Sequence, residues 1–242
     1  MTTPDAVDVV DVVVLGMGPG GEDVAGKLAE AGLSVVGVDG GLVGGECPYW
    51  GCVPSKMMIR AANLLAEARR IPGIAGNAVV RPDWAPVAAR IRDEATDNWD
   101  DTIAVERFEG KGGRFVRGHG RLTASDVVTV GDRQFRATRA VVLATGTTPA
   151  IPPIPGLTDT PYWTNHDVIE AKQLPDSIIV LGGGAIGAEL TQVFARFGVV
   201  VTIVEAASRL LPLEEPEAGS LLADVLEHEG VTVITEIGRA HV

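Results

Sequence analysis

One pattern of glycines occurs twice in this chain of 242 residues and constrains the fold more than any other feature. In each copy a β-branched apolar run precedes G-x-G-x-x-G, a helical spacing of apolar residues follows, and a second apolar run ends in an acid. The residues are Gly16, Gly18, Gly21 and Asp39 in the first copy, and Gly182, Gly184, Gly187 and Glu205 in the second. Each acid follows its first glycine by 23 positions (39 − 16 and 205 − 182), which predicts one βαβ device used twice.

The types of residue in this pattern suit a fold that binds a dinucleotide. The first glycine permits a tight turn, the second lets the backbone approach a pyrophosphate, and the third lets the helix pack closely on the strand. The pyrophosphate then lies at the helix N-terminus, and the acid accepts hydrogen bonds from a ribose hydroxyl. The sequence therefore predicts an α/β chain with two Rossmann-like dinucleotide-binding folds in tandem.

The segment between the two copies predicts helices over residues 60–107, divided by a turn-rich stretch at 71–84. Short strands are expected at 113–122, 126–130 and 133–138, followed by a further buried strand that ends at Gly146. A proline-rich link begins at Pro149. We therefore place a domain boundary there, with one domain over residues 1–149 and the next over 150–242.

Cys47 and Cys52, the only cysteines, lie within GGECPYWGCVPSK at residues 44–56. A disulfide that closes so short a loop stabilises a fold by about 2 kcal/mol, which makes stability a weak reason for the pair. No metal is expected, because the four histidines lie scattered rather than at ligand spacing. Pro54 fits the first turn of a helix, so Cys52 is expected at a helix N-terminus that favours thiolate, with Lys56 one turn on. The pair is therefore predicted to be redox-active.

Charge and hydropathy exclude some partners. The net charge of −12 argues against nucleic acid, whose phosphates require clustered lysine and arginine. The first residues carry no basic region followed by a cleavage site, and no apolar stretch reaches the length of a membrane span. We therefore expect a cytoplasmic protein without a membrane partner, in which close cysteines serve chemistry rather than stapling.

The order of these motifs resembles the pyridine nucleotide–disulfide oxidoreductases, the family of dihydrolipoamide dehydrogenase, glutathione reductase and mercuric reductase. The resemblance covers nearly the whole chain: the first dinucleotide motif, GGxCxxxxCxPSK, ATG before the proline-rich link, and the second dinucleotide motif. It implies that the first fold binds FAD and the second binds NAD. It also implies a homodimer in which a Cys47–Cys52 disulfide passes electrons between the flavin and a disulfide or small-molecule substrate.

The resemblance assigns roles by position. Cys47 would exchange with the substrate, Cys52 would face the flavin, and Lys56 would lie beside the flavin ring and pair with Glu189. The implied FAD contacts are Gly16, Gly18, Gly21, Asp39, Gly45, Lys56, His119, Gly120, Thr145 and Gly146. The implied NAD contacts are Gly182, Gly184, Ile186, Gly187 and Glu205. NAD is preferred to NADP because the Glu205 carboxylate would accept bonds from a ribose 2′-hydroxyl and repel a 2′-phosphate.

Each of these roles has an ordinary alternative. Lys56 also fits a solvated charge on a helix, and Glu189 also fits a residue chosen for helix propensity. His119 would contact the adenine through its backbone, so its imidazole fits a surface side chain equally well. Tyr49 and Trp50, between the cysteines, fit either a shield over the disulfide or core packing.

The chain departs from the better-known family members around the cysteines and in length. Glu46 replaces the usual Thr, and Pro-Tyr-Trp replaces a Leu-Asn-Val-like run, so the resemblance does not extend to lipoamide, glutathione or mercuric ion as substrate. The segment that completes the FAD domain and the domain that supplies a His–Glu pair are not in the 242 residues. We therefore expect both folds to be incomplete, residues 237–242 to be a non-native tail, and the chain to be inactive alone. Two alternatives stay open: a quinone-type flavin reductase that does not use the thiols, and a non-catalytic cofactor-binding fragment.

Overall fold

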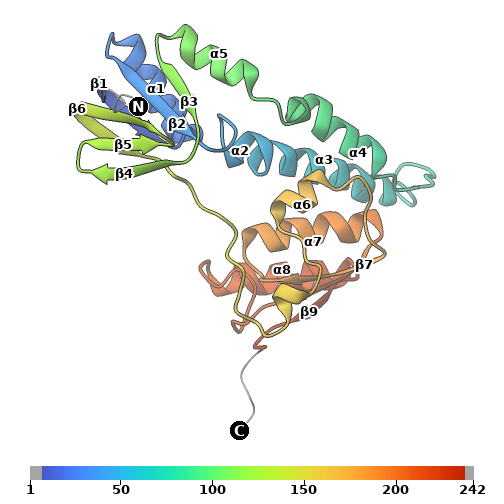
Figure 1. Cartoon of the computed structure of the whole chain (residues 1–242). Helices are drawn as coiled ribbons and strands as arrows, with labels where there is room; N and C mark the ends of the chain where they lie inside the picture. The colour runs from blue at the N-terminus through green and yellow to red at the C-terminus, as the bar shows by residue number, and fades with distance from the viewer. Residues whose placement is uncertain (1–6, 238–242) are drawn as a thin grey trace. The chain divides into compact units, whose positions relative to one another are not determined.

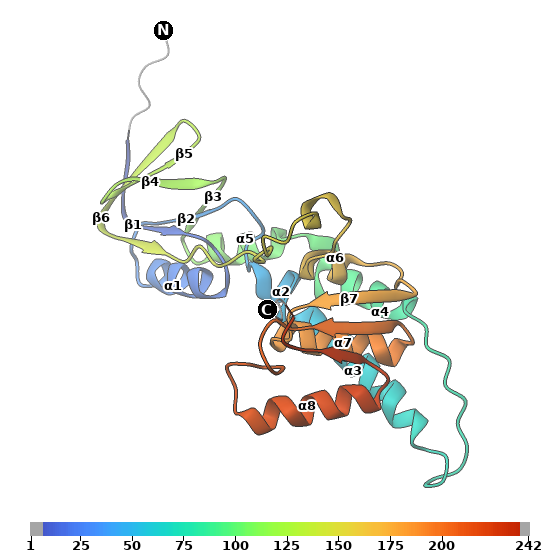
Figure 2. The same cartoon turned by 90° about the horizontal axis from the view of Figure 1, so that it is seen from below.

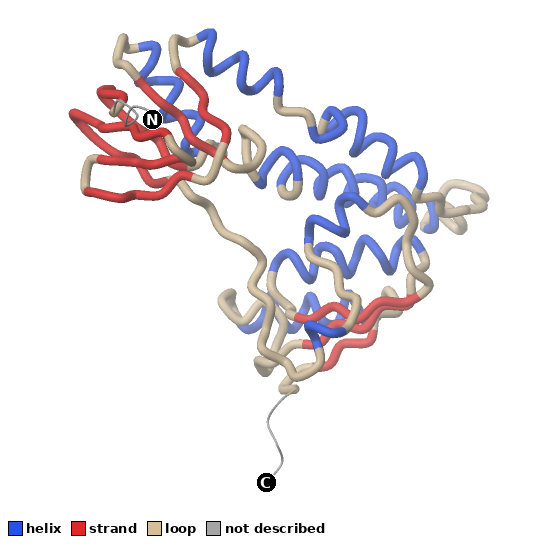
Figure 3. Tube along the Cα trace, viewed as in Figure 1, coloured by secondary structure: helices blue, strands red, loops and turns tan. Residues whose placement is uncertain are grey.

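The computed structural model describes residues 7–237 and divides into two compact units. The first combines the residues up to Val53 with Arg92–Tyr162, and the second combines Pro54–Ile91 with the residues from Trp163 onward. Each unit contains a sheet and helices (Figures 1 and 3). The domain boundary near Pro149 stays a prediction, and all of the expected tail beyond residue 237 lies outside the described residues.

A six-stranded sheet in the order β3-β2-β1-β6-β5-β4 forms the first unit. The elements are β1 (Asp8–Leu15), α1 (Pro19–Glu30), β2 (Val35–Asp39), α2 (Glu46–Tyr49), the three-residue turn η2 (Asp97–Trp99), α5 (Thr102–Gly110), β3 (Arg114–Arg117), β4 (Gly120–Ala124), β5 (Val127–Val130), β6 (Arg133–Leu143) and η3 (Leu157–Asp159). Strands β3, β2, β1 and β6 are parallel, whereas β5 pairs antiparallel with both β6 and β4. The parallel part carries the β1–α1–β2 unit that the first glycine pattern predicts.

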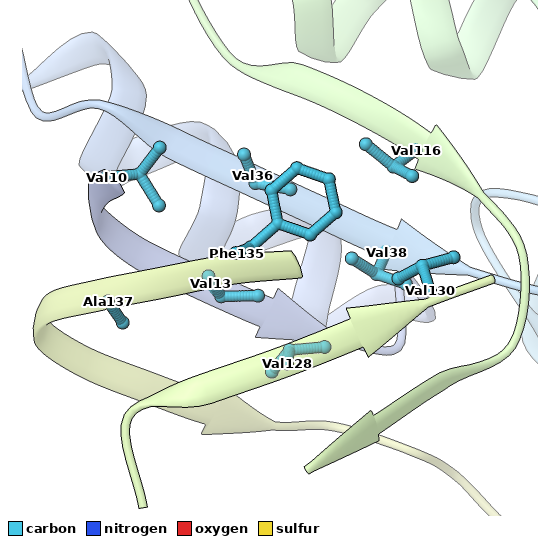
Figure 4. Close-up of a cluster of buried hydrophobic side chains, with 9 residues drawn as sticks. All are labelled: Val10, Val13, Val36, Val38, Val116, Val128, Val130, Phe135 and Ala137. Carbon is cyan, nitrogen blue, oxygen red and sulfur yellow. The ribbon is translucent and has the colours of Figure 1, made fainter. Parts of the chain in front are cut away.

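From Val12 to Val14 the side chains of β1 alternate between two buried clusters, because successive residues of a strand point to opposite faces, and a register shift between Val10 and Val12 places Val10 in the same cluster as Val13. Val12 and Val14 pack with the residues of α1 and α5, including Ala25 and Phe108. The opposite face carries a cluster drawn from β1, β2, β3, β5 and β6 (Figure 4): Val10, Val13, Val36, Val38, Val116, Val128, Val130, Phe135 and Ala137. Burial on both faces makes β1 the centre of this unit and fixes the turn that follows it.

The second unit contains a three-stranded parallel sheet in the order β7-β8-β9. Its elements are α3 (Cys52–Arg69), whose first two residues belong to the first unit, α4 (Ala85–Arg90), the π-helical turn η1 (Ile91–Ala95) across the boundary, α6 (Asn165–Glu170), β7 (Ser177–Leu181), α7 (Ala185–Phe197), β8 (Val200–Val204), α8 (Pro216–His228) and β9 (Thr232–Ile234). Helices α7 and α8 lie beside the strands (Figure 2). Val201, Ile203, Phe194 and Leu226 are buried and form the centre of the unit.

Three expectations about strands are wrong in detail. Gly118, at φ +149°, divides the strand expected at 113–122 into β3 and β4. The runs at 133–138 and 140–146 form a single strand, β6, which ends at Leu143 and leaves that side chain 61% exposed. Strand β7 is parallel as expected but not buried, since Ile179 is 66% exposed. An apolar run predicts a strand, but it does not show whether another element covers the face.

Candidate functional site

The first glycine turn has the shape that its sequence predicts. Gly16 has φ +97°, and a Cβ there would lie 2.1 Å from the Ala144 carbonyl oxygen. A Cβ at Gly21 would lie 1.9 Å from the Gly16 carbonyl oxygen. Gly18 differs, because a Cβ there would meet nothing within 4 Å. Two glycines are thus required by the protein itself, whereas the space at Gly18 is open to a ligand.

Asp39 fastens this turn to the end of β2. Its Oδ2 accepts a hydrogen bond of 2.6 Å from the Met17 N–H, and its Oδ1 accepts one of 2.7 Å from the Gly41 N–H. The acid therefore has a structural role besides its expected contact with a ribose. Each carboxylate oxygen keeps a further lone pair with which it could accept a ligand hydroxyl.

The second glycine turn repeats this geometry in the second unit. Gly182 has φ +105°, and a Cβ at Gly187 would lie 2.1 Å from the Gly182 carbonyl oxygen, whereas Gly184 is open. Glu205 accepts hydrogen bonds from the Gly183 N–H at 2.6 Å and from the Ala207 N–H at 2.7 Å. The predicted contact Ile186, in the first turn of α7, is 66% exposed.

Both turns fit the pyrophosphate of a dinucleotide. Gly18 and Gly184 are the N-cap residues of α1 and α7, and neither helix has a side-chain hydrogen bond at its cap. The first N–H groups of each helix are therefore not taken by a capping side chain, and no Cβ stands in front of them. Helix N-termini with this open approach favour anions.

Other predicted FAD contacts gather around the first turn. A Cβ at Gly45 would lie 2.8 Å from the Gly18 Cα, and one at Gly16 would lie 3.0 Å from the Thr145 Cα. The His119 ring lies against Gly40, next to Asp39. Gly120 begins β4 and packs against Leu15, and Gly146 follows the end of β6 with φ +67°. These predicted contacts thus lie near the carboxyl ends of β1, β2 and β6 in the first unit, whereas Lys56, which was also a predicted FAD contact, belongs to the second unit.

The two cysteines are not joined by a disulfide in the structure and interact with each other. Cys47 lies in the four-residue helix α2, and Cys52 is the first residue of α3, where Pro54 in the first turn had predicted a helix start. A hydrogen bond to Cys52 raises the pKa of the Cys47 thiol, and burial and the charge of Cys52 raise it further. Cys52 is the more exposed of the two thiols.

In the second unit, α3 and α7 are joined by polar contacts two helical turns apart. The Lys56 Nζ donates to both Glu189 carboxylate oxygens, at 2.7 and 2.8 Å. Seven residues further along both helices, Arg196 donates to the Asn63 Oδ1. Arg196 also forms a two-pronged pair with Glu229, at 2.8 and 2.6 Å. The exposed Lys56–Glu189 pair would contribute little by itself, so the half-buried contacts of Arg196 set the register.

Sequence reasoning did not find Arg196, nor the ion pair of Asp101 with Arg117, whose atoms approach to 2.5 Å in the first unit. Asp101 stands directly before a helix, a position that suggests a cap, but its partner Val43 is 58 residues away. Within residues 7–237 no group of three or more His, Cys, Asp or Glu side chains could hold a metal ion. Over the same range no helix is both long and apolar enough to cross a membrane.

Comparison with known proteins gives one consistent family. Residues 10–240 match the family model described as pyridine nucleotide-disulphide oxidoreductase. The chain is 35% identical to the mercuric reductase of Shigella flexneri over 239 residues, which cover 92% of this chain and 40% of the relative. It is 36% identical to the dihydrolipoyl dehydrogenase of Chlorobaculum tepidum over 232 residues, which cover 92% of this chain and 48% of the relative.

A solved structure agrees with these relatives. The HOCl-induced flavoprotein disulfide reductase RclA from Escherichia coli has a TM-score of 0.79 and 27% sequence identity, over 93% of this chain and 49% of that one. The chain spans half the length of such proteins or less. With a family match over nearly all its residues, on a fold with two glycine turns and a cysteine pair at a helix start, this chain belongs to the pyridine nucleotide-disulphide oxidoreductase family.

Proposed function

We propose that this chain is part of an FAD-dependent, NAD-linked disulfide oxidoreductase in which Cys47 and Cys52 form the redox disulfide. The observation that carries the proposal is the thiol pair itself: Cys52 begins α3, and the Cys47 thiol hydrogen-bonds it. The comparisons support the same class, since the relatives are flavoprotein disulfide reductases, mercuric reductases and dihydrolipoyl dehydrogenases. The proposed substrate is a disulfide or another small molecule. The complete protein is proposed to be a cytoplasmic homodimer.

When bound, the flavin and the nicotinamide supply the hydride and electron transfer chemistry. The chain's own residues bind and orient them. Gly18 and Gly184 leave room for the two pyrophosphates, and Asp39 and Glu205 fasten the turns on which these lie. Lys56 places an ammonium group that Glu189 holds in position. On oxidation the two thiols lose two protons and two electrons as the S–S bond forms.

The preference for NAD over NADP follows from the surroundings of Glu205. Arg209, four residues further on, is the cation that could neutralise a 2′-phosphate there. Its guanidinium donates instead to the Pro212 and Glu214 carbonyl oxygens, at 2.9 Å each. A 2′-phosphate would therefore meet a carboxylate without compensation, at a cost on the order of 1–4 kcal/mol. We expect NADH to bind at least tenfold more tightly than NADPH.

The thiol proposal is tested by equilibrating the purified protein in glutathione redox buffers. Alkylation and mass spectrometry then follow the two thiols, which are the only ones in the chain. A reversible intramolecular disulfide is expected, and Cys47→Ser and Cys52→Ser should each abolish it. Thiols that oxidise only to separate mixed disulfides would refute the redox pair and favour a quinone-type flavin reductase.

The cofactor proposal is tested by titrating the protein with NADH and NADPH in a calorimeter. Glu205→Gln should reduce the difference in affinity between NADH and NADPH. Glu217→Gln, in the first turn of α8, should leave that difference unchanged. Equal binding of both cofactors by the unaltered protein would show that Glu205 does not set the choice.

Sedimentation of the flavin-loaded protein tests the proposed homodimer.

A further inference from the structure

The loop at residues 40–45 connects Asp39, at the end of β2, to the helix that carries Cys47. Its last two residues are glycines with positive φ, +105° at Gly44 and +63° at Gly45. The Gly44 N–H donates to the Met17 carbonyl oxygen at 2.7 Å, and the Gly45 N–H donates to Leu42 at 3.0 Å. The path of this loop decides where Cys47 is placed.

Two charged side chains from distant segments hold the rest of the loop. The Asp101 Oδ2 accepts a hydrogen bond of 2.6 Å from the Val43 N–H. Arg117, from β3, donates through one nitrogen to the Gly41 carbonyl oxygen and through another to the Asp101 Oδ2, at 2.5 Å. A single ion pair thus holds the loop at Gly41 and at Val43, and the loop, Asp101 and Arg117 all belong to the first unit.

This ion pair differs from the surface pairs of the chain. Asp101 is 8% exposed and Val43 is fully buried. A buried carboxylate is costly unless its partners satisfy it, and a buried N–H without a partner is costly too. Asp101 is also the N-cap residue of α5, yet its side chain makes no hydrogen bond to that helix. The Asp101 carboxylate therefore does not cap α5, as an N-cap aspartate usually would, and instead accepts hydrogen bonds from Val43 and Arg117.

The chain reaches this position through a strained turn. Asp97, Asn98 and Trp99 have φ values of +47°, +55° and +57°, three consecutive non-glycine residues in the left-handed region. Such a run is unfavourable and persists only where the surroundings impose it. It delivers Asp101 to Val43 and also the Asp100 carbonyl oxygen to the Tyr49 hydroxyl, at 3.4 Å. Tyr49 lies between the two cysteines and is buried.

We propose that Asp101 and Arg117 are positioning residues for the cysteine pair. They clamp Gly41 and Val43, and through Gly44 and Gly45 they fix the start of the short helix that holds Cys47 beside Cys52. A fixed Cys47 loses little freedom when the S–S bond forms, which favours the intramolecular disulfide over mixed disulfides. The inference rests on the proposed redox role of the thiols and adds the device that aligns them.

The test measures the equilibrium between the protein dithiol plus glutathione disulfide and the protein disulfide plus two glutathione molecules. Asp101→Asn keeps the shape of the side chain but removes the charge. Arg117→Lys keeps the charge but cannot reach Gly41 and Asp101 together. The matched control is Asp126→Asn, which loses an exposed ion pair with Arg136 in the same unit. Circular dichroism establishes that each variant is folded, and the alkylation rate of Cys47 relative to Cys52 is a second readout.

Asp101→Asn should lower the equilibrium constant about tenfold and speed the alkylation of Cys47. Arg117→Met, which removes the guanidinium altogether, should also lower the equilibrium constant and speed the alkylation of Cys47. Arg117→Lys should have a smaller effect on both quantities than Arg117→Met. Asp126→Asn should change neither quantity by more than about twofold. Folded Asp101→Asn and Arg117→Met proteins with unchanged constants and rates would overturn the inference. If Asp101→Asn did not fold, Arg117→Lys and Arg117→Met would decide it by the same criterion. Failure of the unaltered thiols to pair would instead refute the proposed function, and the Cys47 alkylation rates would then decide whether the clamp holds that residue.

Discussion

The two glycine turns have the same local geometry and very different surroundings. Gly16 and Gly182 have φ values of +97° and +105°, and the acids Asp39 and Glu205 each accept two backbone hydrogen bonds. A Cβ at Gly16 would collide with the Ala144 carbonyl oxygen, whereas a Cβ at Gly182 would meet nothing within 4 Å. The same glycine pattern thus leaves no room for a side chain at Gly16 but leaves open space at Gly182.

The difference comes from the neighbouring strands. Strand β1 lies between β2 and β6, and β6 brings Ala144 to the back of the first turn. Strand β7 lies at the end of its three-stranded sheet in the described part of the chain, so no strand supplies a residue equivalent to Ala144. Local sequence therefore shapes the turn, and the next strand decides how tightly it is enclosed.

The largest expected effect compares alanine at the two first glycines. Gly16→Ala combines a collision with backbone and a strained φ and should cost about 3 kcal/mol of unfolding free energy or more. Gly182→Ala has only the strained φ and should cost about 1–2 kcal/mol. Hydrogen exchange in increasing urea, read on peptides from each unit, separates the two values. Equal costs would show that β6 does not distinguish the turns.

A smaller effect is expected at the two acids. Asp39→Asn and Glu205→Gln each weaken two charge-assisted hydrogen bonds to backbone and should cost about 1–3 kcal/mol, equal to within about 0.5 kcal/mol. Asp23→Asn, which loses only an exposed pair with Lys27, should cost less than about 0.5 kcal/mol. The same hydrogen-exchange measurement applies. A cost at one acid alone would break the equivalence of the two turns.

The smallest effect on stability is expected at the second glycines. Gly18 and Gly184 have ordinary φ values of −67° and −73° and open space at the Cβ position. Alanine at either should change the unfolding free energy by about 0.5 kcal/mol, the scale of an unfavourable N-cap residue. Gly184→Ala should nevertheless weaken NADH binding at least tenfold, measured by calorimetry, because the methyl group occupies the place of the pyrophosphate. Undiminished binding would place the nucleotide elsewhere.

Short-range features of the molecule were predictable. The glycine turns, the helix start at Cys52 and the parallel pairing of the strands follow from residues within one βαβ unit or one helical turn. Of the long-range polar contacts, the Lys56–Glu189 pair was expected from the family resemblance, whereas those of Asp101 and Arg196 were not predictable. Asp101 and Val43 are 58 residues apart, and Arg196 and Asn63 are 133 apart. Nothing in the local pattern of either pair indicates its partner.

The sequence by itself determined the family, the two dinucleotide folds and the position of the thiol pair, because φ preferences, helix starts and apolar periodicity act over a few residues. The tertiary structure alone decided that β1 is buried and β7 exposed, that Arg196 sets the register of α3 on α7, and that Asp101 grips the loop before Cys47. The physical reason is that burial and ion pairing depend on which distant segments fill the space around a residue. That outcome is set by the packing of whole elements rather than by the preferences of neighbouring residues.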